Sequence, residues 1–322
     1  MVQSPDEAHY RMIAKRILDG AVVPFLGAGV NLCGRPAETP WARGQYLPSG
    51  AELSAYLARQ VDYPFDDSTD LLRVSQYVDV MLGDGPLYAE LHDVFDADYA
   101  PTPVHKLLAK LPAMVRASTS DKPRCFPLIV TTNYDDALER AFMEAGEPYD
   151  LVVYIADDSD DRGLFLHTSP YGQSQIIPVP NTYGDLRLDE RPVIAKIHGA
   201  VGRGVVERDS FVITENHYID YLSHADIAQL IPVNIAKRLR KSHLLFLGYS
   251  LKDWNLRVIL NRLFEDAPVK WKYWAVQPKP DSIEERSWSR RNVDLLDVQL
   301  ETYVGGLTAA LLDASAAAEP VP

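Results

Sequence analysis

The sequence predicts an α/β protein with a doubly wound, mostly parallel sheet of the Rossmann-like class. Short apolar runs of strand length alternate with amphipathic helical segments along most of the chain. Four of these runs end in a short motif of glycine or polar residues, and an open parallel sheet binds ligands beyond the carboxyl ends of its strands. The motifs are Gly27-Ala28-Gly29, Asn133-Tyr134-Asp135, His198-Gly199 and Gly248-Tyr249-Ser250.

The N-terminal part is predicted as one helix, one strand and a long loop. Apolar residues at helical spacing indicate a helix over residues 6–19, and Gly20 is expected to end it. A strand over residues 21–26 then leads into the first glycine motif. Residues 30–49 contain three prolines, two glycines and Trp41, which is typical of an irregular loop.

A helical insertion is expected at about residues 50–118, between the first two strands. Ser49 is followed three residues later by Glu52, which is a capping-box pattern at the start of a helix. Residues 68–118 then contain several amphipathic segments in succession. The sequence therefore predicts that helices, rather than strands, separate the first glycine motif from the second motif.

The rest of the chain predicts further strands and helices, with a small turn-rich insertion at about residues 156–190. The acidic run at residues 157–161 is expected to form an exposed turn. We interpret residues 1–317 as one domain, followed by a disordered tail at residues 318–322. The predicted strands cover residues 127–132, 150–155, 192–197, 211–214, 243–247, 271–277 and 293–298, and helices cover residues 134–145, 226–241, 251–266, 282–291 and 303–315, with another beginning at residue 215.

The charge balance argues against a general electrostatic attraction to nucleic acid or anionic lipid. The net charge is −13 and the isoelectric point is about 5.0, whereas such partners require a basic surface. The basic run at residues 237–241 is interpreted as the solvated C-terminal end of a helix, where cations are favoured. Direct binding of nucleic acid is therefore not expected.

Cysteine and histidine usage predicts no metal site. Cys33 and Cys125, the two cysteines, exclude a four-cysteine zinc site and do not support a disulfide framework. The eight histidines show no metal-ligand spacing. No stretch approaches the roughly eighteen apolar residues needed to span a bilayer, and the N-terminus lacks the apolar core of a signal peptide. The sequence therefore predicts a cytoplasmic protein without membrane contact.

The first glycine motif favours close approach of the backbone to a phosphate. Gly27 and Gly29 have no side chain to hinder such an approach. The dinucleotide fingerprint of dehydrogenases requires a further glycine where this chain has Leu32, and no acidic residue is clearly placed to hold a ribose. A dehydrogenase is therefore disfavoured, and the alternative for this motif is a simple turn from strand to loop.

The other motifs offer polar groups at strand ends. Asn133 and Asp135 would present an amide, able to hold a water molecule or sugar hydroxyl, and a carboxylate, although both residues also suit helix capping. His198 suits a general base because histidine titrates near neutrality, and the alternative is a structural histidine. The turn at Gly248 and Ser250 would contact a phosphate or ribose, or cap the next helix.

As a set, these segments resemble the sirtuin-like superfamily over roughly residues 20–265. The resemblance is strongest to the bacterial sirtuin-like proteins of anti-phage defence, which cleave NAD instead of deacylating proteins. The segments that carry it occur in the order expected for that superfamily. They are VPFLGAGVN, IVTTNYDDALE, IAKIHG, FVITENHYIDYL and LLFLGYSLKDWNLR.

The resemblance implies that NAD is the substrate and assigns a role to each motif. Asn133 would be the catalytic asparagine, His198 the catalytic histidine, and Asp135 a contact at the nicotinamide end. The implied reaction cleaves the nicotinamide–ribose bond, releasing nicotinamide and ADP-ribose or a cyclised ADP-ribose. The residues that would hold the ADP-ribose part are Gly27, Ala28, Gly29, Gly248 and Ser250.

The chain departs from the deacylase sirtuins in three respects. Val30-Asn31 replaces the last pair of their GAGIS motif, their four zinc-binding cysteines are absent, and their peptide-binding segment has no clear counterpart. These departures favour an NAD glycohydrolase over an NAD-dependent protein deacylase. A non-catalytic NAD-binding sensor subunit and a structural subunit of a defence complex are the remaining alternatives.

We expect activity to be controlled through assembly. The sequence leaves no room for a large C-terminal sensor domain, so we expect a homo-oligomer and a separate regulatory protein, either a nucleotide-processing enzyme or an ATPase. The loop at residues 30–49 and the helices at residues 68–118 are the expected moving elements. They flank the first motif and are longer than simple connectors.

Overall fold

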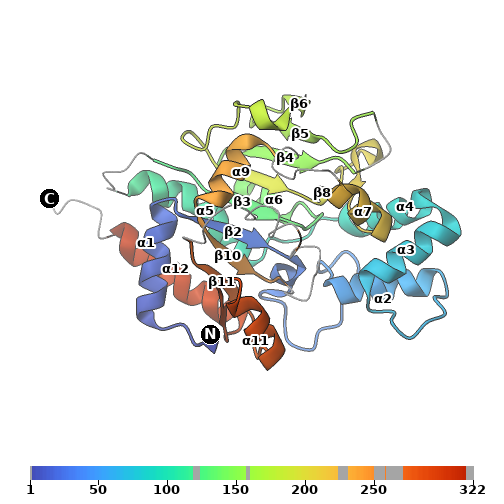
Figure 1. The fold of residues 1–322 in the computed structure, drawn as a ribbon, viewed down its shortest axis with the longest axis horizontal. Coiled ribbons are helices and arrows are strands. Elements are labelled where there is room, and N and C mark those ends of the chain that lie inside the picture. The colour runs from blue at the N-terminus through green and yellow to red at the C-terminus, as the bar shows by residue number, and fades with distance from the viewer. Residues whose placement is uncertain are drawn as a thin grey trace.

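Helices cover both faces of one large, mostly parallel sheet in the computed structural model of the chain (Figure 1). The structure describes residues 2–118, 124–156, 160–223, 231–249, 258 and 271–316. The predicted helix at 251–266, except residue 258, and the tail at 318–322 lie outside these ranges. The three-layer arrangement confirms the predicted α/β fold.

The strands of the main sheet fall where the sequence has its short apolar runs. The strands at the centre of the sheet are buried along their whole length, which is typical of parallel sheets covered on both faces. In chain order the strands are β1 (Val2–Gln3), β2 (Val22–Leu26), β3 (Leu128–Thr131), β4 (Asp150–Tyr154), β5 (Phe165–Thr168), β6 (Ser174–Ile177), β7 (Val193–Lys196), β10 (His243–Leu247), β11 (Tyr273–Val276) and β12 (Val293–Leu296).

The side of the sheet on which the chain adds strands changes next to β2. The ten strands lie in the order β1-β12-β11-β10-β2-β3-β7-β4-β5-β6. From β2 the chain builds β3, β4 and β7 on one side, and it then crosses to the other side to form β10, β11 and β12. The switch therefore lies between β2 and β10, which is where open α/β sheets bind ligands.

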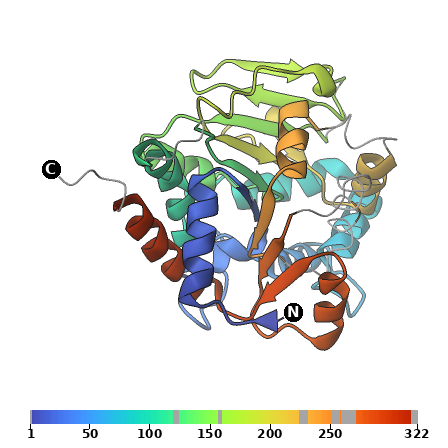
Figure 2. The same ribbon diagram turned by 60° about the vertical axis from the view of Figure 1, so that its left-hand side comes forward.

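Both edges of the sheet contain strands that the sequence did not define. β5 and β6 run antiparallel and extend one edge from within the segment expected as the small insertion (Figure 2). β1 pairs in parallel with β12 at the opposite edge. The short strand predicted at residues 211–214 corresponds to β9 (Ser210–Phe211), which begins one residue earlier and ends at Phe211. It pairs with β8 (Gly199–Ala200) in a separate two-stranded sheet.

The helices have the expected periodic apolar faces. The predicted helices at residues 6–19 and 303–315 correspond to the first and last helices of the structure. In chain order the helices are α1 (Glu7–Leu18), α2 (Gly50–Gln60), α3 (Leu71–Leu82), α4 (Asp84–Phe95), α5 (Pro103–Ala117), α6 (Ala137–Glu144), α7 (Glu215–Ser223), α9 (Val233–Arg240), α11 (Ser282–Ser289) and α12 (Leu300–Ala316), with 3₁₀ turns η1 (Ala28–Leu32), η2 (Pro180–Thr182) and η3 (Val206–Arg208).

Local signals set several helix ends as the sequence predicts. Ser49 and Glu52 form the predicted capping box of α2, with both reciprocal hydrogen bonds present. Gly20 follows α1 with a φ of +67°, a left-handed conformation that glycine adopts without strain. The basic run at residues 237–241 includes the last turn of α9, as expected, and Lys237, Arg240 and Lys241 are exposed, whereas Arg238 is partly buried. These termini confirm that capping chemistry defines the helix boundaries.

The side chains of β2 alternate between two cores. Val23 and Phe25 pack into one core with α7, α9 and α11, whereas Val22 and Leu26 pack into the other with α1, α5, α6 and α12. This alternation follows from the two-residue period of a strand. It places β2 in the middle of the molecule, so the loop that follows β2 starts from a rigid position.

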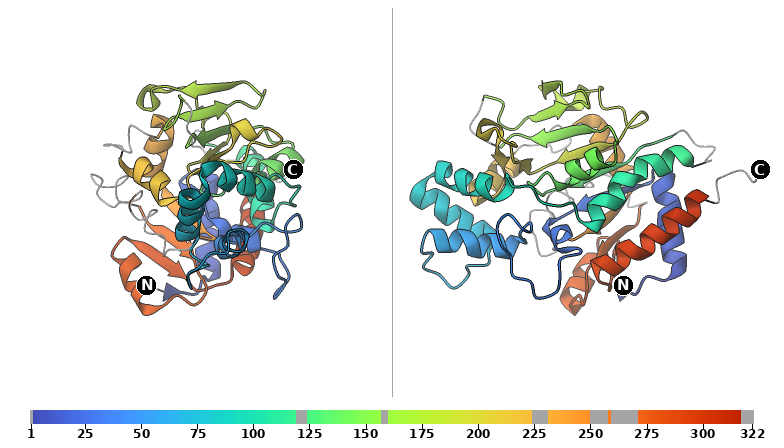
Figure 3. Two further views of the ribbon diagram at one scale, coloured as in Figure 1. Left: turned by 90° about the vertical axis from the view of Figure 1, so that its right-hand side faces the viewer. Right: turned by 180° about the vertical axis from the view of Figure 1, so that it is seen from behind.

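The helices α2, α3 and α4 lie together at one end of the molecule (Figure 3), and their apolar side chains form a third core. Leu57, Val78 and Leu91 pack there with Tyr134, in the turn after β3, and with Phe211 of β9. The helix α5 belongs elsewhere, because it packs against α6 and α12 in the layer beside the sheet. Within residues 50–118, then, α2 to α4 form a separate unit against the carboxyl ends of the strands.

Candidate active site

The four motifs follow four neighbouring strands, β10, β2, β3 and β7. The last paired residues of these strands form one row across the sheet, in which Leu247 pairs with Leu26, Leu26 with Thr131, and Thr131 with Lys196. Each motif begins one or two residues beyond this row. The parallel register therefore brings the motifs to the same edge of the sheet, as the sequence predicts.

The glycine loops after β2 and β10 pack directly against each other. The Gly29 N–H donates to the carbonyl oxygen of Gly248 at 2.7 Å, and the Gly27 N–H donates to the carbonyl oxygen of Leu247 at 3.1 Å. Gly248 has a φ of +61°, and a Cβ placed there would lie 2.2 Å from the nitrogen of Val30. The close contact between the two loops therefore requires glycine at positions 29 and 248.

The predicted nucleotide contacts of these loops stay predictions. Ala28, Gly29 and Gly248 keep part of their surface exposed at the strand ends. The N–H groups of Gly27 and Gly29 already have acceptors within the protein. Ser250, the remaining residue predicted to hold the ADP-ribose part, lies outside the described residues.

Asn133 connects the loop after β3 to the loop after β2. Its side-chain amide donates to the carbonyl oxygen of Gly27 at 3.3 Å, and its N–H donates to the Thr131 hydroxyl at 3.0 Å. The helix predicted from residue 134 begins only at Ala137, so Asn133 does not cap it. Asn133 is 8% exposed and lies at the edge of the sheet where the motifs meet.

Asp135 is held from two sides. One carboxylate oxygen accepts from the N–H of Ala137 at 3.1 Å, which is a local turn at the start of α6. The other accepts from the side-chain amide of Asn31 at 3.2 Å. Sequence reasoning noted Asn31 only as a departure from the sirtuin motif. The sequence signal that could have assigned it to this site was an amide residue between two apolar residues, Val30 and Leu32, directly after the glycine motif.

His198 is enclosed by the helix α7. Its side chain is 2% exposed, and its Nδ1 lies 3.4 Å from the hydroxyl of Tyr218. The rings of Tyr218 and Tyr221 meet the imidazole edge to face, with centroid distances of 5.3 and 5.9 Å. The structure thus places His198 beside the other motifs. Its role as a general base stays a prediction.

Lys196 is a buried cation that sequence reasoning missed. It ends β7, two residues before His198, and it is 1% exposed. Its ammonium donates to the carbonyl oxygens of Tyr134 and Asp135 and forms an ion pair with Glu139 at 2.7 Å. A single lysine within the apolar run PVIAKI was the sequence signal, because lysine is almost never fully buried unless it is paired.

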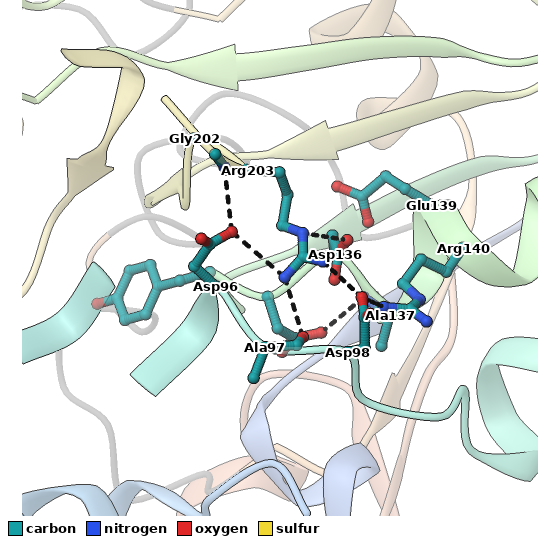
Figure 4. Close-up of polar contacts among 12 residues, drawn as sticks. Asp96, Ala97, Asp98, Asp136, Ala137, Glu139, Arg140, Gly202 and Arg203 are labelled. Carbon is teal, nitrogen blue, oxygen red and sulfur yellow. Dashed lines mark hydrogen bonds and ion pairs between the residues drawn. The ribbon is translucent and has the colours of Figure 1, made fainter. Parts of the chain in front are cut away.

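Arg203 joins the site to the end of α4 (Figure 4). Its guanidinium lies 2.6 Å from a carboxylate oxygen of Asp98 and 3.3 Å from one of Asp96. On its other side the guanidinium lies 3.2 Å from Asp136, the neighbour of Asp135. One side chain therefore connects the loop after β8, the start of α6 and the unit formed by α2 to α4.

Burial shifts two acid–base groups near the site. It raises the pKa of the Asp136 carboxyl, and the nearby positive charges of Arg203 and Lys196 act in the opposite direction. It lowers the pKa of His105, on α5, to about 4, against the influence of the Asp135 charge, which raises it. His105 is therefore neutral at physiological pH.

In the ranges that the structure describes, no group of three or more histidine, cysteine, aspartate or glutamate side chains could hold a metal ion. None of the helices in these ranges is long and apolar enough to cross a membrane.

A mostly parallel sheet with polar and glycine-rich loops meeting at its topological switch defines a Rossmann-like α/β protein with its candidate site at the strand ends. The family model of the SIR2-like domain matches residues 127–296, which is more than half of the chain. The chain belongs to this family.

Two curated bacterial proteins are similar to this chain. One, named NAD(+) hydrolase ThsA, from Acinetobacter baumannii (strain 532279), is 28% identical over 252 residues, covering 78% of this chain and 41% of the relative. The other, named Defense-associated sirtuin 2, from Bacillus subtilis, is 23% identical over 218 residues, covering 66% of this chain and 17% of the relative. The chain thus spans less than half the length of these relatives.

Proposed function

We propose that this protein is an NAD+ glycohydrolase that cleaves the bond between nicotinamide and ribose. The observation that carries the proposal is the single row Leu247–Leu26–Thr131–Lys196, because it gathers the glycine loops, Asn133 and His198 at one edge of the sheet. Membership of the SIR2-like family supports NAD as the substrate. The printed name of one relative, an NAD(+) hydrolase, supports cleavage.

The chemistry requires few groups. Nicotinamide leaves as a neutral molecule from a cationic ring, so the protein has to hold the ribose, admit one water molecule and stabilise an oxocarbenium-like ribosyl cation. In the proposal Asn133 positions the water and a ribose hydroxyl, and Asp135 holds the carboxamide of nicotinamide. His198 polarises a ribose hydroxyl or accepts the proton of the attacking group. Attack by water gives ADP-ribose, and attack by an internal nucleophile gives a cyclised ADP-ribose.

The test measures nicotinamide release from NAD by the purified protein and by His198→Ala. A general base contributes roughly 10²–10⁴-fold, so we expect turnover to fall by at least about 10²-fold while NAD binding is kept. Near-normal turnover in His198→Ala would make this residue structural. Release of nicotinamide only with an acyl-lysine peptide would favour a protein deacylase, and NAD binding without turnover in any assembly would favour a sensor subunit.

The enclosure of the site supports control of activity by assembly. Asn133, Asp135 and His198 are 8, 4 and 2% exposed, so a nucleotide reaches them only after covering groups move. We propose that homo-oligomer formation and a separate regulatory protein, a nucleotide-processing enzyme or an ATPase, shift this equilibrium. Light scattering should show an oligomer. A monomer that cleaves NAD at full rate, unaffected by any partner, would contradict this part of the proposal.

The biological role we propose is NAD depletion in the cytoplasm during anti-phage defence. It is supported by the printed name of the Bacillus subtilis relative, a defense-associated sirtuin. The expected result is loss of cellular NAD upon phage infection in bacteria that express the protein. Cells that express His198→Ala should keep their NAD under the same infection.

A further inference from the structure

Lys196 makes more contacts than an ion pair requires. A lysine ammonium has three N–H donors. Here they meet the carboxylate of Glu139, at 2.7 Å, and the carbonyl oxygens of Tyr134, at 3.3 Å, and of Asp135. Lys196 is 1% exposed, so these groups replace the water that the charge loses on folding. Two of its three partners belong to the turn that carries the candidate site residues.

The two carbonyls flank the Cα atom of Asp135. The carbonyl of Tyr134 belongs to the peptide group before the Cα atom of Asp135. The carbonyl of Asp135 belongs to the peptide group after it. Peptide groups are planar and rigid, so fixing both of them fixes φ and ψ of the residue between them. The direction in which the Asp135 side chain leaves the backbone is then fixed as well.

The turn lies between β3, which ends at Thr131, and α6, which begins at Ala137. Its two ends are held by backbone bonds, from Thr132 to Leu26 and from Arg140 to the carbonyl oxygen of Asp136. In its middle, the carbonyl oxygen of Tyr134 also accepts from the N–H of Val201 at 3.0 Å, and the carbonyl oxygen of Asp135 accepts from Lys196. The turn follows the strand next to β7, and Lys196 pairs in register with Thr131. A cation at the end of β7 therefore reaches the turn directly, and the same strand leads to His198 two residues later.

We propose that Lys196 is a positioning residue, which fixes the Asn133–Asp136 turn relative to His198 through the carbonyl oxygens of Tyr134 and Asp135. The consequence for cleavage rests on the proposed NAD glycohydrolase function. The positioning of the turn does not, because it follows from contacts within the protein. Glu139 has a different part, since it neutralises the buried charge of the lysine.

Two variants separate these parts. Lys196→Met/Glu139→Leu removes both buried charges together, so no unpaired charge remains in the core. Glu139→Gln is the matched control, because it removes the ion pair and keeps the lysine with its two carbonyl contacts. Amide hydrogen exchange of residues 133–137 measures the turn without any ligand, and nicotinamide release measures kcat and KM for NAD.

We expect the double variant to melt cooperatively while the amides of residues 133–137 exchange at least about tenfold faster, as expected for the loss of charge-assisted hydrogen bonds. Its kcat should fall by about 10²-fold, because small misplacements of reacting groups are costly. Glu139→Gln should be less stable in urea unfolding, because the buried lysine loses its counter-charge, but it should keep kcat and the exchange of residues 133–137 near those of the wild type.

Unchanged exchange at residues 133–137 in the folded double variant would overturn the proposal. If the double variant does not fold, Glu139→Gln decides: a loosened turn there would show that the ion pair, and not the carbonyl contacts, holds it. If the wild type releases no nicotinamide in any assembly while exchange rises as expected, the proposed function fails and the positioning inference stands. If the wild type cleaves NAD while exchange in the double variant is unchanged, the positioning inference fails and the proposed function stands.

Discussion

The side-chain amide of Asn133 lies 3.3 Å from the carbonyl oxygen of Gly27 and donates a hydrogen bond to it. This contact joins the polar turn after β3 to the glycine loop after β2, across two paired strands. Gly27 is in turn bonded through its N–H to Leu247 at the end of β10. Three of the four motifs are therefore linked into one hydrogen-bonded unit, and a change in one of them should be felt in the others.

Replacement of Asn133 by aspartate should cost more stability than replacement by alanine. Aspartate keeps the shape of the side chain but places a carboxylate, which cannot donate, against the carbonyl oxygen of Gly27. The carbonyl oxygen of Gly27 keeps the N–H of Val30 as a donor, but the carboxylate oxygen that faces it would have none there, which costs about 1–3 kcal/mol. Urea unfolding measures the difference. Asn234→Asp loses a similar amide–carbonyl bond, to Leu186, away from the site, and it should keep NAD cleavage.

Gly248→Ala should disrupt the contact between the two glycine loops. The left-handed backbone is unfavourable for alanine, and the new Cβ would lie 2.2 Å from the nitrogen of Val30. We expect a loss of about 2–4 kcal/mol in the free energy of unfolding, together with weaker NAD binding. Gly146→Ala is the control, because Gly146 has a φ of +67° and no atom within 4 Å of its Cβ position. Equal effects of the two changes would contradict the importance of the loop contact.

Arg203→Met should loosen α2, α3 and α4 from the rest of the protein. The lost contacts to Asp96 and Asp136 leave partly buried carboxylates without their cation, whereas the contact to exposed Asp98 contributes little. We expect a cost of about 1–3 kcal/mol. Hydrogen exchange should rise in α4 and stay low in β2 and β3.

Arg187→Met provides the comparison for Arg203→Met. The partners of Arg187, Asp189 and Glu190, are exposed carboxylates, so its loss should change stability by no more than about 0.5 kcal/mol. A similar increase of exchange in α4 for both variants would mean that Arg203 has no special part in holding these helices.

Stability should fall in acid because of His105. Burial lowers the pKa of His105 from 6.5 to about 4, so between these pH values the unfolded chain binds a proton that the folded protein does not. The stabilisation is complete above about pH 6.5 and is lost as the pH falls towards 4, by up to roughly 3 kcal/mol.

His105→Gln tests this pH dependence. Glutamine suits this position of the α5 capping box, and it does not titrate. The variant should therefore lose less stability than the wild type between pH 7.5 and pH 4.5, measured by urea unfolding. Parallel losses in the two proteins would show that other groups cause the acid sensitivity.

A chelator should leave NAD cleavage unchanged. Departure of nicotinamide needs no Lewis acid, and no cluster of metal-binding side chains occurs in the described ranges. The measurement is nicotinamide release before and after treatment with EDTA. Loss of activity that a defined metal restores would contradict the proposed mechanism.

Much of the fold follows from local patterns in the sequence. Apolar runs mark the central strands, and the signals at Gly20, Ser49 and Glu52 mark helix ends, because each depends on residues only a few positions apart. The predicted strand at residues 211–214 was wrong in its extent, because only Phe211 of these residues lies in a strand, β9. There, backbone pairing with Gly199, at a φ of +86°, turns the chain into a small separate sheet.

The candidate site was predictable where polar residues follow apolar runs, and not where a residue acts through a partner that is distant in the sequence. The sequence singled out Asn133, Asp135 and His198 because they follow apolar runs. It did not assign Asn31 or Lys196, whose partners lie far along the chain: the Asn31–Asp135 bond spans 104 residues, and the bond from Lys196 to Glu139 spans 57.

The sequence by itself determined the alternation of strands and helices, the four motifs at strand ends and the family. Those features are written in short segments and in their order. The tertiary structure alone decided the strand order, the register that aligns Leu26 with Leu247 and Thr131, and the enclosure of His198 by α7. The physical reason is that register and enclosure depend on which distant surfaces pack together, and that packing is settled by the burial of the whole sheet rather than by any one segment.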